Sequence, residues 1–454
     1  MPTAANTTIK NKSLYYIIFI FFIVLISISF IRPPMASPDE THHFARAYTL
    51  SNGEIIPKNY SNLMSGGYVD EELLKFTNTY FSRFTGINTP YADLNSSDFK
   101  WSSDLIFFEN PGASYYFPIL YFPSVIAINT GRFFDLTIKK SYHLACLLTI
   151  IFNITIIIIS IKTFDKIILL LPILCTPMSL YQLSSPILDG PTFSITLLSL
   201  AIYFKIITTP IFSVKLLSIL SLLITVISIT RVNLSPMLLL IIHAISQVDR
   251  KIIKNLIPLY ILPIITILFW YFFSISSTAD LRVPRPNSNI DTIYHYIYHP
   301  VFFMSKFFNT IIDTENLIFY GKSYIGILGW LNISLPKYSY LLISSFLFIY
   351  FIIIIFNNKP LYSVNIYPLT SSIISILLVF LALDINWTHL QSSTIEGVQG
   401  RYFIPSSLLF ISTFIKSIPD RNLCLLLTCA PAYIIMLTLG STFSVILSLF
   451  NYHG

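Results

Sequence analysis

The sequence contains few charged residues for its length. Only 11% of its 454 residues are Asp, Glu, Lys or Arg, whereas 54% are hydrophobic and the mean hydropathy is +0.71. This composition excludes a soluble globular domain, in which about 25% of the residues would be charged. Apolar windows of about 17 to 20 residues, long enough to cross a hydrocarbon core of about 30 Å as helix, recur along most of the chain. We therefore expect an all-α, multi-pass membrane protein.

Cysteines, basic clusters and repeats are also scarce. The four cysteines lie in or beside apolar segments, so their expected role is packing and not disulfide bonding. No basic stripe with interleaved aromatic residues is present, which excludes a nucleic-acid partner and assigns the formal charge of +7 to loops at the membrane surface. No low-complexity linker or internal repeat divides the chain. We expect one polytopic domain over residues 1–454.

The apolar windows predict about eleven transmembrane helices, the first of them uncleaved. They cover residues 14–31, 143–160, 165–182, 191–208, 212–230, 234–247, 255–275, 339–356, 364–383, 401–418 and 422–448. The run at 118–129 is shorter and is interrupted by prolines, which favours a re-entrant or surface-lying helix over a span.

Positive charge predicts the orientation of these helices. If residues 118–129 do not cross, most basic turns fall on the side of Lys10 and Lys12, which is then cytoplasmic. The group formed by Arg132, Lys139 and Lys140 is the exception. The extracytoplasmic regions are then a first loop at 32–142, a second at 276–338, a third at 384–400 and a short turn with Asp189. Most of the unusual polar residues lie in these regions, at one membrane face.

The stretch SPDETHHFAR, which follows the first predicted span, has the pattern of a helix start. Ser37 is the expected cap, Pro38 the first helical residue, and Glu40 would complete a capping box. We expect the helix to run on from there through the polar residues that follow.

Four polar residues of this stretch would share one helix face. Asp39, His42, His43 and Arg46 stand at offsets of three, four and seven. Such a group could deprotonate a hydroxyl, bind a divalent ion or hold a phosphate. The alternative is structural, because acidic residues in a first turn offset the helix dipole and Arg or His at an interface contacts lipid headgroups.

A second polar motif is EGVQGRYFIP, residues 396–405. Gln399 lies between two glycines, and Arg401 directly precedes an apolar run, so its guanidinium would lie at the depth of lipid phosphates. Simple snorkelling to the headgroups is the alternative.

Further candidates lie in three other outer segments. GKSYIGILGWLNISLP contains Lys322 and Trp330, ENPGASYYFP contains Tyr115 and Tyr116, and SSPILDGP contains Asp189. The aromatic residues could contact a sugar ring or belong to the interfacial aromatic belt, and Asp189 could be a functional partner or a solvent-exposed acid.

These motifs, in this order, resemble a known family. The segments PPMASPDETHHFARAYTLSNGEIIP, LCTPMSLYQLSSPILDG, YIGILGWLNISLP and GVQGRYFIP are similar to those of the bacterial membrane family catalogued as domain of unknown function 2142 (DUF2142), which is grouped with the GT-C glycosyltransferases. The resemblance covers nearly the whole chain. It implies a GT-C-like bundle of transmembrane helices with in-plane helices in a large first extracytoplasmic loop.

The resemblance also implies chemistry. GT-C enzymes use a sugar on a polyprenyl phosphate and an acidic residue of the first outer loop. Here that residue is Asp39, with Glu40 as its neighbouring candidate, acting as a base on an acceptor hydroxyl. Arg401 would offset the phosphate charge, helped by Arg46 or Lys322. The substrate-binding candidates are His42, His43, Tyr115, Tyr116, Asp189, Trp330 and Gln399.

The metal requirement and the acceptor follow less directly. A first-loop Asp-x-Asp pair is absent from the sequence, so metal dependence is not carried over, although DETHH leaves a divalent cation open. The richness in Ile, Lys, Asn, Phe and Tyr resembles bacterial surface-polysaccharide genes. The resulting hypothesis is a glycosyltransferase of the bacterial inner membrane, its active site facing the periplasm, that transfers a sugar such as glucose from a polyprenyl phosphate to a glycan such as lipopolysaccharide O-antigen.

Two other functions stay open. An O-antigen polymerase or ligase also joins lipid-linked glycans at this face, but depends on arginine-rich outer loops, and outer arginines are few here. A non-enzymatic lipid-linked sugar transporter or flippase would carry ionisable residues at mid-bilayer depth and a repeat of halves, and neither is visible in the sequence.

Overall fold

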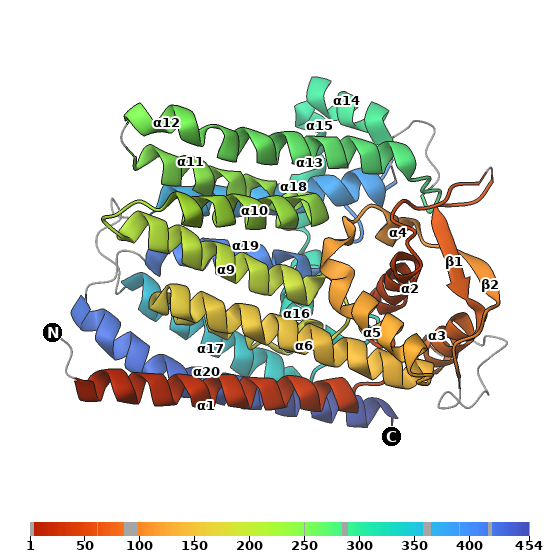
Figure 1. Ribbon diagram of the computed structural model, residues 1–454, viewed down its shortest axis with the longest axis horizontal. Helices are drawn as coiled ribbons and strands as arrows, with labels where there is room; N and C mark the ends of the chain where they lie inside the picture. The colour runs from red at the N-terminus through yellow and green to blue at the C-terminus, as the bar shows by residue number, and fades with distance from the viewer. Residues whose placement is uncertain are drawn as a thin grey trace.

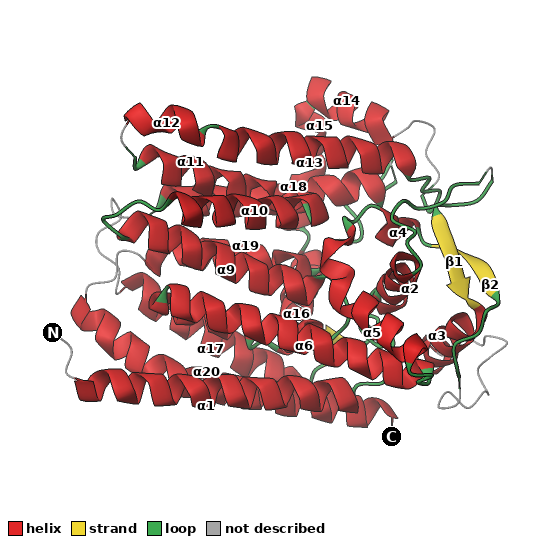
Figure 2. Cartoon of the chain, viewed as in Figure 1, coloured by secondary structure: helices red, strands yellow, loops and turns green. Residues whose placement is uncertain are grey.

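The computed structural model shows a bundle of long helices that run side by side, with a smaller region of short helices and two strands at one end (Figure 1). It describes residues 4–60, 62–85, 99–248, 250–283, 289–356, 365–389, 391–415 and 420–453. The described chain is mainly helical, and its four strands form two small two-stranded sheets (Figure 2). The all-α, multi-pass membrane architecture expected from hydropathy is confirmed.

Six helical segments of the described chain are long and apolar enough to cross a membrane. They are Ile138–Thr163 (α6), Asp189–Thr208 (α9), Ile252–Ser277 (α12, Arg250–Leu256, with α13, Pro258–Ser277), Lys337–Phe356 (α17), Ile366–Asn386 (α18) and Cys429–Asn451 within α20 (Asp420–His453). About eleven spans are expected from the sequence, and the remaining ones are shorter or bent.

The shorter apolar helices coincide with expected spans in three cases. These are α1 (Ala4–Ile31), α10 (Val214–Thr230), and the continuous pair of η3 (Val232–Met237) and α11 (Leu238–Ser246). The expected span at 401–418 begins as η5 (Gly400–Phe403) and α19 (Ile404–Ile415), and its last residues lie outside the described chain.

The span expected at 165–182 is not one straight helix. It consists of η2 (Asp165–Leu170), α7 (Leu171–Leu174) and α8 (Pro177–Leu183), and the two halves meet at 101°. Pro177 is the reason for the break, because a proline has no N–H to donate to the preceding turn and instead suits the first turn of a new helix. Thr176 caps that new helix by accepting from the Ser179 N–H.

The segment that follows α1, expected as the first extracytoplasmic loop, forms the group of short helices and strands at the right of Figure 1. Its elements are α2 (Glu40–Ser51), β1 (Gly66–Asp70), α3 (Glu71–Thr85), β2 (Leu105–Glu109), α4 (Pro111–Ser114), η1 (Pro118–Tyr121) and α5 (Phe122–Phe133). Strands β1 and β2 pair antiparallel, with Gly66 opposite Glu109. The run at 118–129 is η1 with the first part of α5, a helix of 12 residues that is too short to cross a bilayer and packs against α2 and α6.

The segment expected as the second extracytoplasmic loop consists mainly of three helices. They are α14 (Asn289–Tyr298), α15 (Pro300–Ile312) and α16 (Thr314–Gly326), followed by the small pair β3 (Ile327–Leu328) and β4 (Ile333–Ser334). A buried ion pair joins this loop to the bundle, because the ammonium of Lys306 in α15 lies 3.2 Å from the carboxylate of Asp384 in α18.

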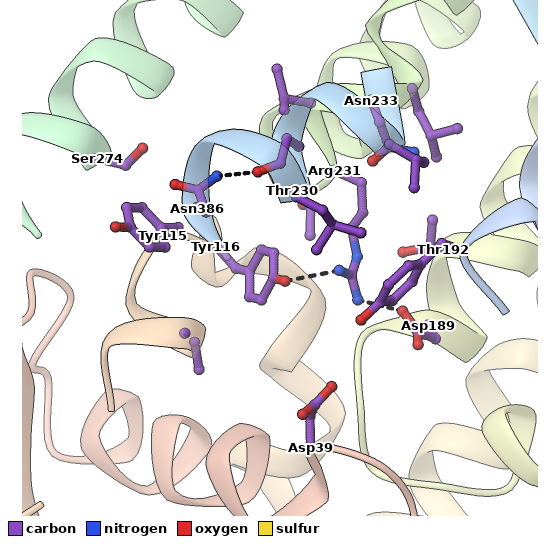
Figure 3. Close-up of a pocket in the computed structure, with 18 of the residues that line it drawn as sticks. Asp39, Tyr115, Tyr116, Asp189, Thr192, Thr230, Arg231, Asn233, Ser274 and Asn386 are labelled. Carbon is purple, nitrogen blue, oxygen red and sulfur yellow. Dashed lines mark hydrogen bonds and ion pairs between the residues drawn. The ribbon is translucent and has the colours of Figure 1, made fainter. Parts of the chain in front are cut away.

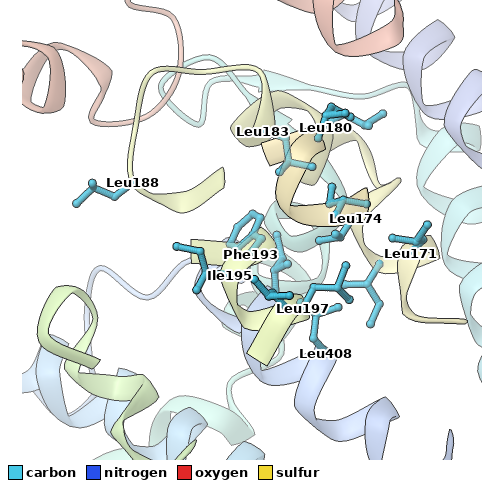
Figure 4. Packing of buried hydrophobic residues seen from close by; sticks show 14 of the residues in the cluster. Leu171, Leu174, Leu180, Leu183, Leu188, Phe193, Ile195, Leu197 and Leu408 are labelled. Atoms are coloured by element: carbon cyan, nitrogen blue, oxygen red, sulfur yellow. The ribbon is translucent and has the colours of Figure 1, made fainter. Parts of the chain in front are cut away.

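Helix α9 forms the centre of the bundle, and α13 lies at its edge. In the membrane window of α9, 89% of the residues are buried, against 17% in that of Ile252–Ser277. Leucine, isoleucine and phenylalanine side chains of α7, α8, α9 and α19 pack together in this centre (Figure 4). Asp189, the first residue of α9, is therefore held by the most buried of these six segments, at the end of the bundle that faces the first loop.

Candidate functional site

A cavity of about 560 Å³ lies where the first loop meets the end of the bundle. Its lining comes from the start of α2, from α4, from the start of α9, from the ends of α10, α13 and α18, and from η5 with the segment before it. In Figure 3 the carboxylates of Asp39 and Asp189, the guanidinium of Arg231 and the ring of Tyr116 converge on this space. The cavity thus combines segments that are far apart in sequence.

Asp39 stands at the N-cap of α2 with a left-handed backbone conformation, φ +62°. The helix therefore begins at Glu40 and not at Pro38 as expected. Only half of the predicted capping box forms: the Ser37 N–H donates to the Glu40 carboxylate at 2.9 Å, whereas the Ser37 hydroxyl is buried without a hydrogen bond among the described residues. The left-handed turn directs the Asp39 side chain into the cavity, where it is 50% exposed.

Arg401 is placed beside Asp39 by a close approach of two backbones. Gly400 lies against α16, where a Cβ atom would be 2.1 Å from the Tyr320 carbonyl oxygen, and its N–H donates to the Ser323 hydroxyl at 2.8 Å. Only glycine fits at this contact. It fixes the next residue, so that the Arg401 guanidinium forms an ion pair with Asp39 at 2.5 Å while its side chain is 2% exposed.

The ion pair determines the charge state of Asp39. Burial by itself would raise the pKa of this carboxyl, but the charge of Arg401 and its hydrogen bond outweigh burial and lower the pKa to about 2. Asp39 is therefore a carboxylate at neutral pH, and a weak base as long as Arg401 is its partner.

A second arginine continues this row of charges. Arg231, in the connection between α10 and η3, forms an ion pair with Asp189, and Asp189 also lies 3.8 Å from the Nε atom of Arg401. Arg231 donates to the Tyr116 hydroxyl at 2.8 Å, and its guanidinium lies 4.6 Å from the centre of that ring. The cavity wall thus carries Asp39, Arg401, Asp189 and Arg231 in alternation of charge.

Arg231 is absent from the residues predicted from sequence. The signal for it is the same one that selects Arg401, an arginine at the outer end of an apolar run, but the connection between the two neighbouring spans is too short to attract notice. Its burial explains why it is paired, since a buried guanidinium needs both an anion and hydrogen-bond acceptors.

Sequence patterns also miss the outer wall of the cavity. Arg282 donates to both carboxylate oxygens of Asp280, at 2.8 and 2.5 Å, and lies 5.0 Å from the ring centre of Trp387. Gly112 and Gly397 pack against these two side chains, and a Cβ atom would lie 2.7 Å from Arg282 or 2.4 Å from Trp387. No local motif marks this wall, because its parts come from three separate loops.

His42 and His43 both line the cavity and are uncharged at neutral pH. The Nδ1 atom of His42 lies 3.0 Å from the Asn110 side-chain oxygen, and that of His43 lies 2.8 Å from the Tyr121 hydroxyl. Burial lowers the pKa of His42 and lowers the pKa of His43 to about 3. Within the described ranges, no group of three His, Cys, Asp or Glu side chains is arranged to hold a metal ion.

The other substrate-binding candidates also lie at the cavity. Tyr115, Tyr116, Trp330 and Gln399 all contribute to its lining. The indole N–H of Trp330 donates to the Met35 carbonyl at 3.0 Å, which ties the segment after α16 to the segment between α1 and α2.

Three predicted site residues do not line the cavity. Glu40 and Arg46 are buried in the first loop, whereas Lys322 is exposed on α16. The carboxylate of Glu40 accepts from the Tyr142 hydroxyl and pairs with Arg32, and burial, opposed by Arg32, raises its pKa. The guanidinium of Arg46 donates to backbone carbonyls of the loop that follows α2. These residues hold the first loop together or face outward.

Comparison with known proteins identifies the family. The sequence pattern of the family described as "Predicted membrane protein (DUF2142)" matches residues 21–411, and the chain belongs to that family. No curated protein matches the sequence. Among solved structures, ArnT from Cupriavidus metallidurans, crystallised with undecaprenyl phosphate, is similar over 98% of this chain and 77% of that chain, with 12% identity and a TM-score of 0.43.

Proposed function

We propose that this DUF2142 protein transfers a sugar from a polyprenyl phosphate to a hydroxyl group of an acceptor glycan outside the cytoplasmic membrane. The observation that carries the proposal is the pairing of Asp39 with Arg401 in the cavity. The two residues are 362 positions apart in sequence, and the fold joins them at the end of the bundle that holds the first loop. A base and a cation side by side at the membrane surface are what this reaction requires.

In the proposed reaction, Asp39 takes the proton of the acceptor hydroxyl while the acceptor oxygen forms a bond to C1 of the donor sugar. The bond between C1 and the phosphate oxygen breaks, and its electron pair stays with the polyprenyl phosphate, which leaves with one more negative charge. Arg401 and Arg231 offset this charge. Asp39 then returns its proton to solvent, and the product carries a new glycosidic bond.

Arg231 takes the place of the helper cations expected from sequence. Arg46 is engaged with backbone carbonyls, and Lys322 is exposed on α16, and neither of them lines the cavity in which the phosphate would bind. Arg231 lies on the cavity wall and shares Asp189 with Arg401. Two guanidiniums can hold a phosphate by forked hydrogen bonds, which a single lysine cannot do.

The cavity also has an apolar wall that suits an isoprenoid chain. Ile267 of α13, Val379 and Leu383 of α18 and Phe193 of α9 contribute to it. The segment Ile252–Ser277, which includes α13, is the least buried of the six long apolar segments of the described chain. Helix α13 carries exposed leucine, isoleucine and phenylalanine side chains suited to lipid. If the isoprenoid chain lies along α13, its phosphate end would contact the arginines of the cavity.

The position of the site supports the proposed compartment, and the side chains around it support a sugar substrate. The first loop and the cavity lie at the end of the bundle opposite to the N-terminus (Figure 1), so an inner-membrane protein with a cytoplasmic N-terminus has this site facing the periplasm. Glucose as the sugar and lipopolysaccharide O-antigen as the acceptor are the substrates proposed for the first assay. Neutral histidines, tyrosines and tryptophans around the carboxylate are suited to sugar rings and their hydroxyl groups.

The test is turnover by the full chain in lipid nanodiscs, supplied with polyprenyl phosphate glucose and acceptor glycan. Release of polyprenyl phosphate together with a glycosylated acceptor is expected. Asp39→Asn should abolish it and Arg401→Gln should reduce it strongly, whereas Lys322→Gln, outside the cavity, should leave it unchanged. Normal turnover by Asp39→Asn would remove Asp39 as the base, and exchange of labelled lipid across the membrane without chemistry would indicate a flippase instead.

A further inference from the structure

The guanidinium of Arg401 already has two carboxylate neighbours before any substrate is present. Asp39 contacts its Nη2 atom, and Asp189 lies 3.8 Å from its Nε atom. A phosphate that is to bind Arg401 through a fork of hydrogen bonds must therefore replace one of them. This inference rests on the function proposed above and concerns the order of its steps.

We infer that the donor phosphate displaces Asp39 from Arg401 while Asp189 stays in place, so that binding of the donor releases the carboxylate that acts on the acceptor. Arg401 thus exchanges one anion for another. Asp189 is the positioning residue that keeps Arg401 and Arg231 together during the exchange.

The exposed fraction of each side chain determines which carboxylate the phosphate displaces from Arg401. The Asp39 side chain is 50% exposed to the cavity, so water or an acceptor hydroxyl can replace its contact with Arg401. The Asp189 side chain is 9% exposed, and its charge would lose most of its compensation if both arginines left it. Breaking a buried pair costs much more than breaking one at the surface of a cavity. Displacement of Asp39 is the less costly of the two.

Arg401 itself cannot move out to meet the phosphate. Its side chain is 2% exposed, one Nη atom donates to the Pro38 carbonyl at 3.3 Å, and its backbone is fixed by the contact of Gly400 with α16. The phosphate must come to the guanidinium, at the position that Asp39 occupies. The short separation of the two groups leaves no room for a third between them.

The exchange has a chemical consequence. With Arg401 as its partner, Asp39 has a pKa of about 2 and is a poor proton acceptor. Once a phosphate neutralises Arg401, the main influence that lowers this pKa is removed, and burial then raises it. Asp39 becomes a stronger base only when a donor is bound, so the donor must bind before the acceptor reacts. Without a donor, Asp39 does not take a proton from an acceptor hydroxyl.

The experiment measures binding of a polyprenyl phosphate without sugar to the full chain in nanodiscs, with the uncharged polyprenol as reference. Wild type, Asp39→Asn and Asp189→Asn are compared. Asparagine tolerates the left-handed backbone at position 39, so Asp39→Asn should fold normally. It should bind the phosphate about fivefold more tightly, because the competing ion pair is gone. Asp189→Asn should show no gain, because the arginines lose their common anchor.

Each variant removes one negative charge next to Arg401, so each is the control for the other. An equal gain in both would show a general effect of charge and overturn the exchange. No change or weaker binding in Asp39→Asn would also overturn it, since Asp39 and phosphate would then bind Arg401 together. If wild type binds polyprenyl phosphate no better than polyprenol, the proposed function itself fails, and this result is distinct from the other two.

Discussion

Two neighbouring carboxylates, Asp39 and Glu40, should respond to substitution in opposite ways. Asp39 lines the cavity, whereas Glu40 is 0% exposed and pairs with Arg32, also 0% exposed, at 3.2 Å. We expect Glu40→Gln to lower the stability of the protein without a specific effect on turnover. Asp39→Asn should abolish turnover with little effect on stability.

The magnitude follows from the surroundings of Arg32. This guanidinium donates to Glu40 and also to the Tyr142 hydroxyl at 2.9 Å and the Tyr181 carbonyl at 3.2 Å. After Glu40→Gln the hydrogen-bond acceptors remain but the only carboxylate paired with Arg32 in the described structure is gone. Removal of one partner of a buried ion pair costs about 3–5 kcal/mol. The half-exposed pair of Asp39 is expected to contribute about 1 kcal/mol or less to stability.

The assay compares unfolding of purified wild type and variants in detergent with their turnover below the unfolding transition. Glu40→Gln should lower the transition markedly and keep turnover per folded molecule. Arg32→Met combined with Glu40→Gln should recover most of the lost stability, because no uncompensated charge then remains. A Glu40→Gln variant as stable as wild type but without turnover would refute the structural role and place Glu40 in the reaction.

Three further outcomes follow from the structure. Gly400→Ala should lower turnover by about 100-fold through displacement of Arg401, as measured against Gly321→Ala, whose added Cβ would meet nothing within 4 Å. Because the pKa of His43 falls from 6.5 to about 3, the unfolded state binds the proton first, and the melting temperature should drop as pH falls below 6.5. His43→Gln should reduce that pH dependence, and an unchanged pH profile would contradict it. Lys306→Met should cost about 3–5 kcal/mol in unfolding assays by removing the cation beside the buried carboxylate of Asp384, and Lys306→Met with Asp384→Asn should restore much of it.

Hydropathy predicts the class of the protein and the position of most helices because burial in lipid depends mainly on composition. It does not predict the path of the chain inside the bundle. Residues 165–182 are apolar enough for a span, yet the break before Pro177 bends them by 101°. The proline is visible in the sequence, but a proline also occurs in helices that stay nearly straight. The large angle between the two halves depends on packing against α9 and α20, which contact these segments in the fold.

Charged residues at the ends of apolar runs can be identified as site candidates from the sequence alone. Which of their neighbours share the cavity depends on the backbone geometry, which the sequence predicts less well. Asp39 and Arg401 stand out as charged residues at membrane edges, and both line the cavity. The common face expected for Asp39, His42, His43 and Arg46 depends on a helix that starts at Pro38. Because α2 starts two residues later, at Glu40, and Asp39 has a left-handed backbone conformation, only the first three reach the cavity. Arg46 instead donates to carbonyls of the loop after α2.

The pairing of acids and arginines links assembly of the fold to preparation of the site. Asp39 of the first loop meets Arg401 of η5, and Asp189 at the start of α9 meets Arg231 directly after α10. Neither pair can form until distant segments have packed, and a lone buried guanidinium is costly. The same pairs keep the arginines in place for an anion. An anionic ligand therefore finds cations that are already ordered, and it has only to compete with Asp39, the most exposed of these carboxylates and arginines.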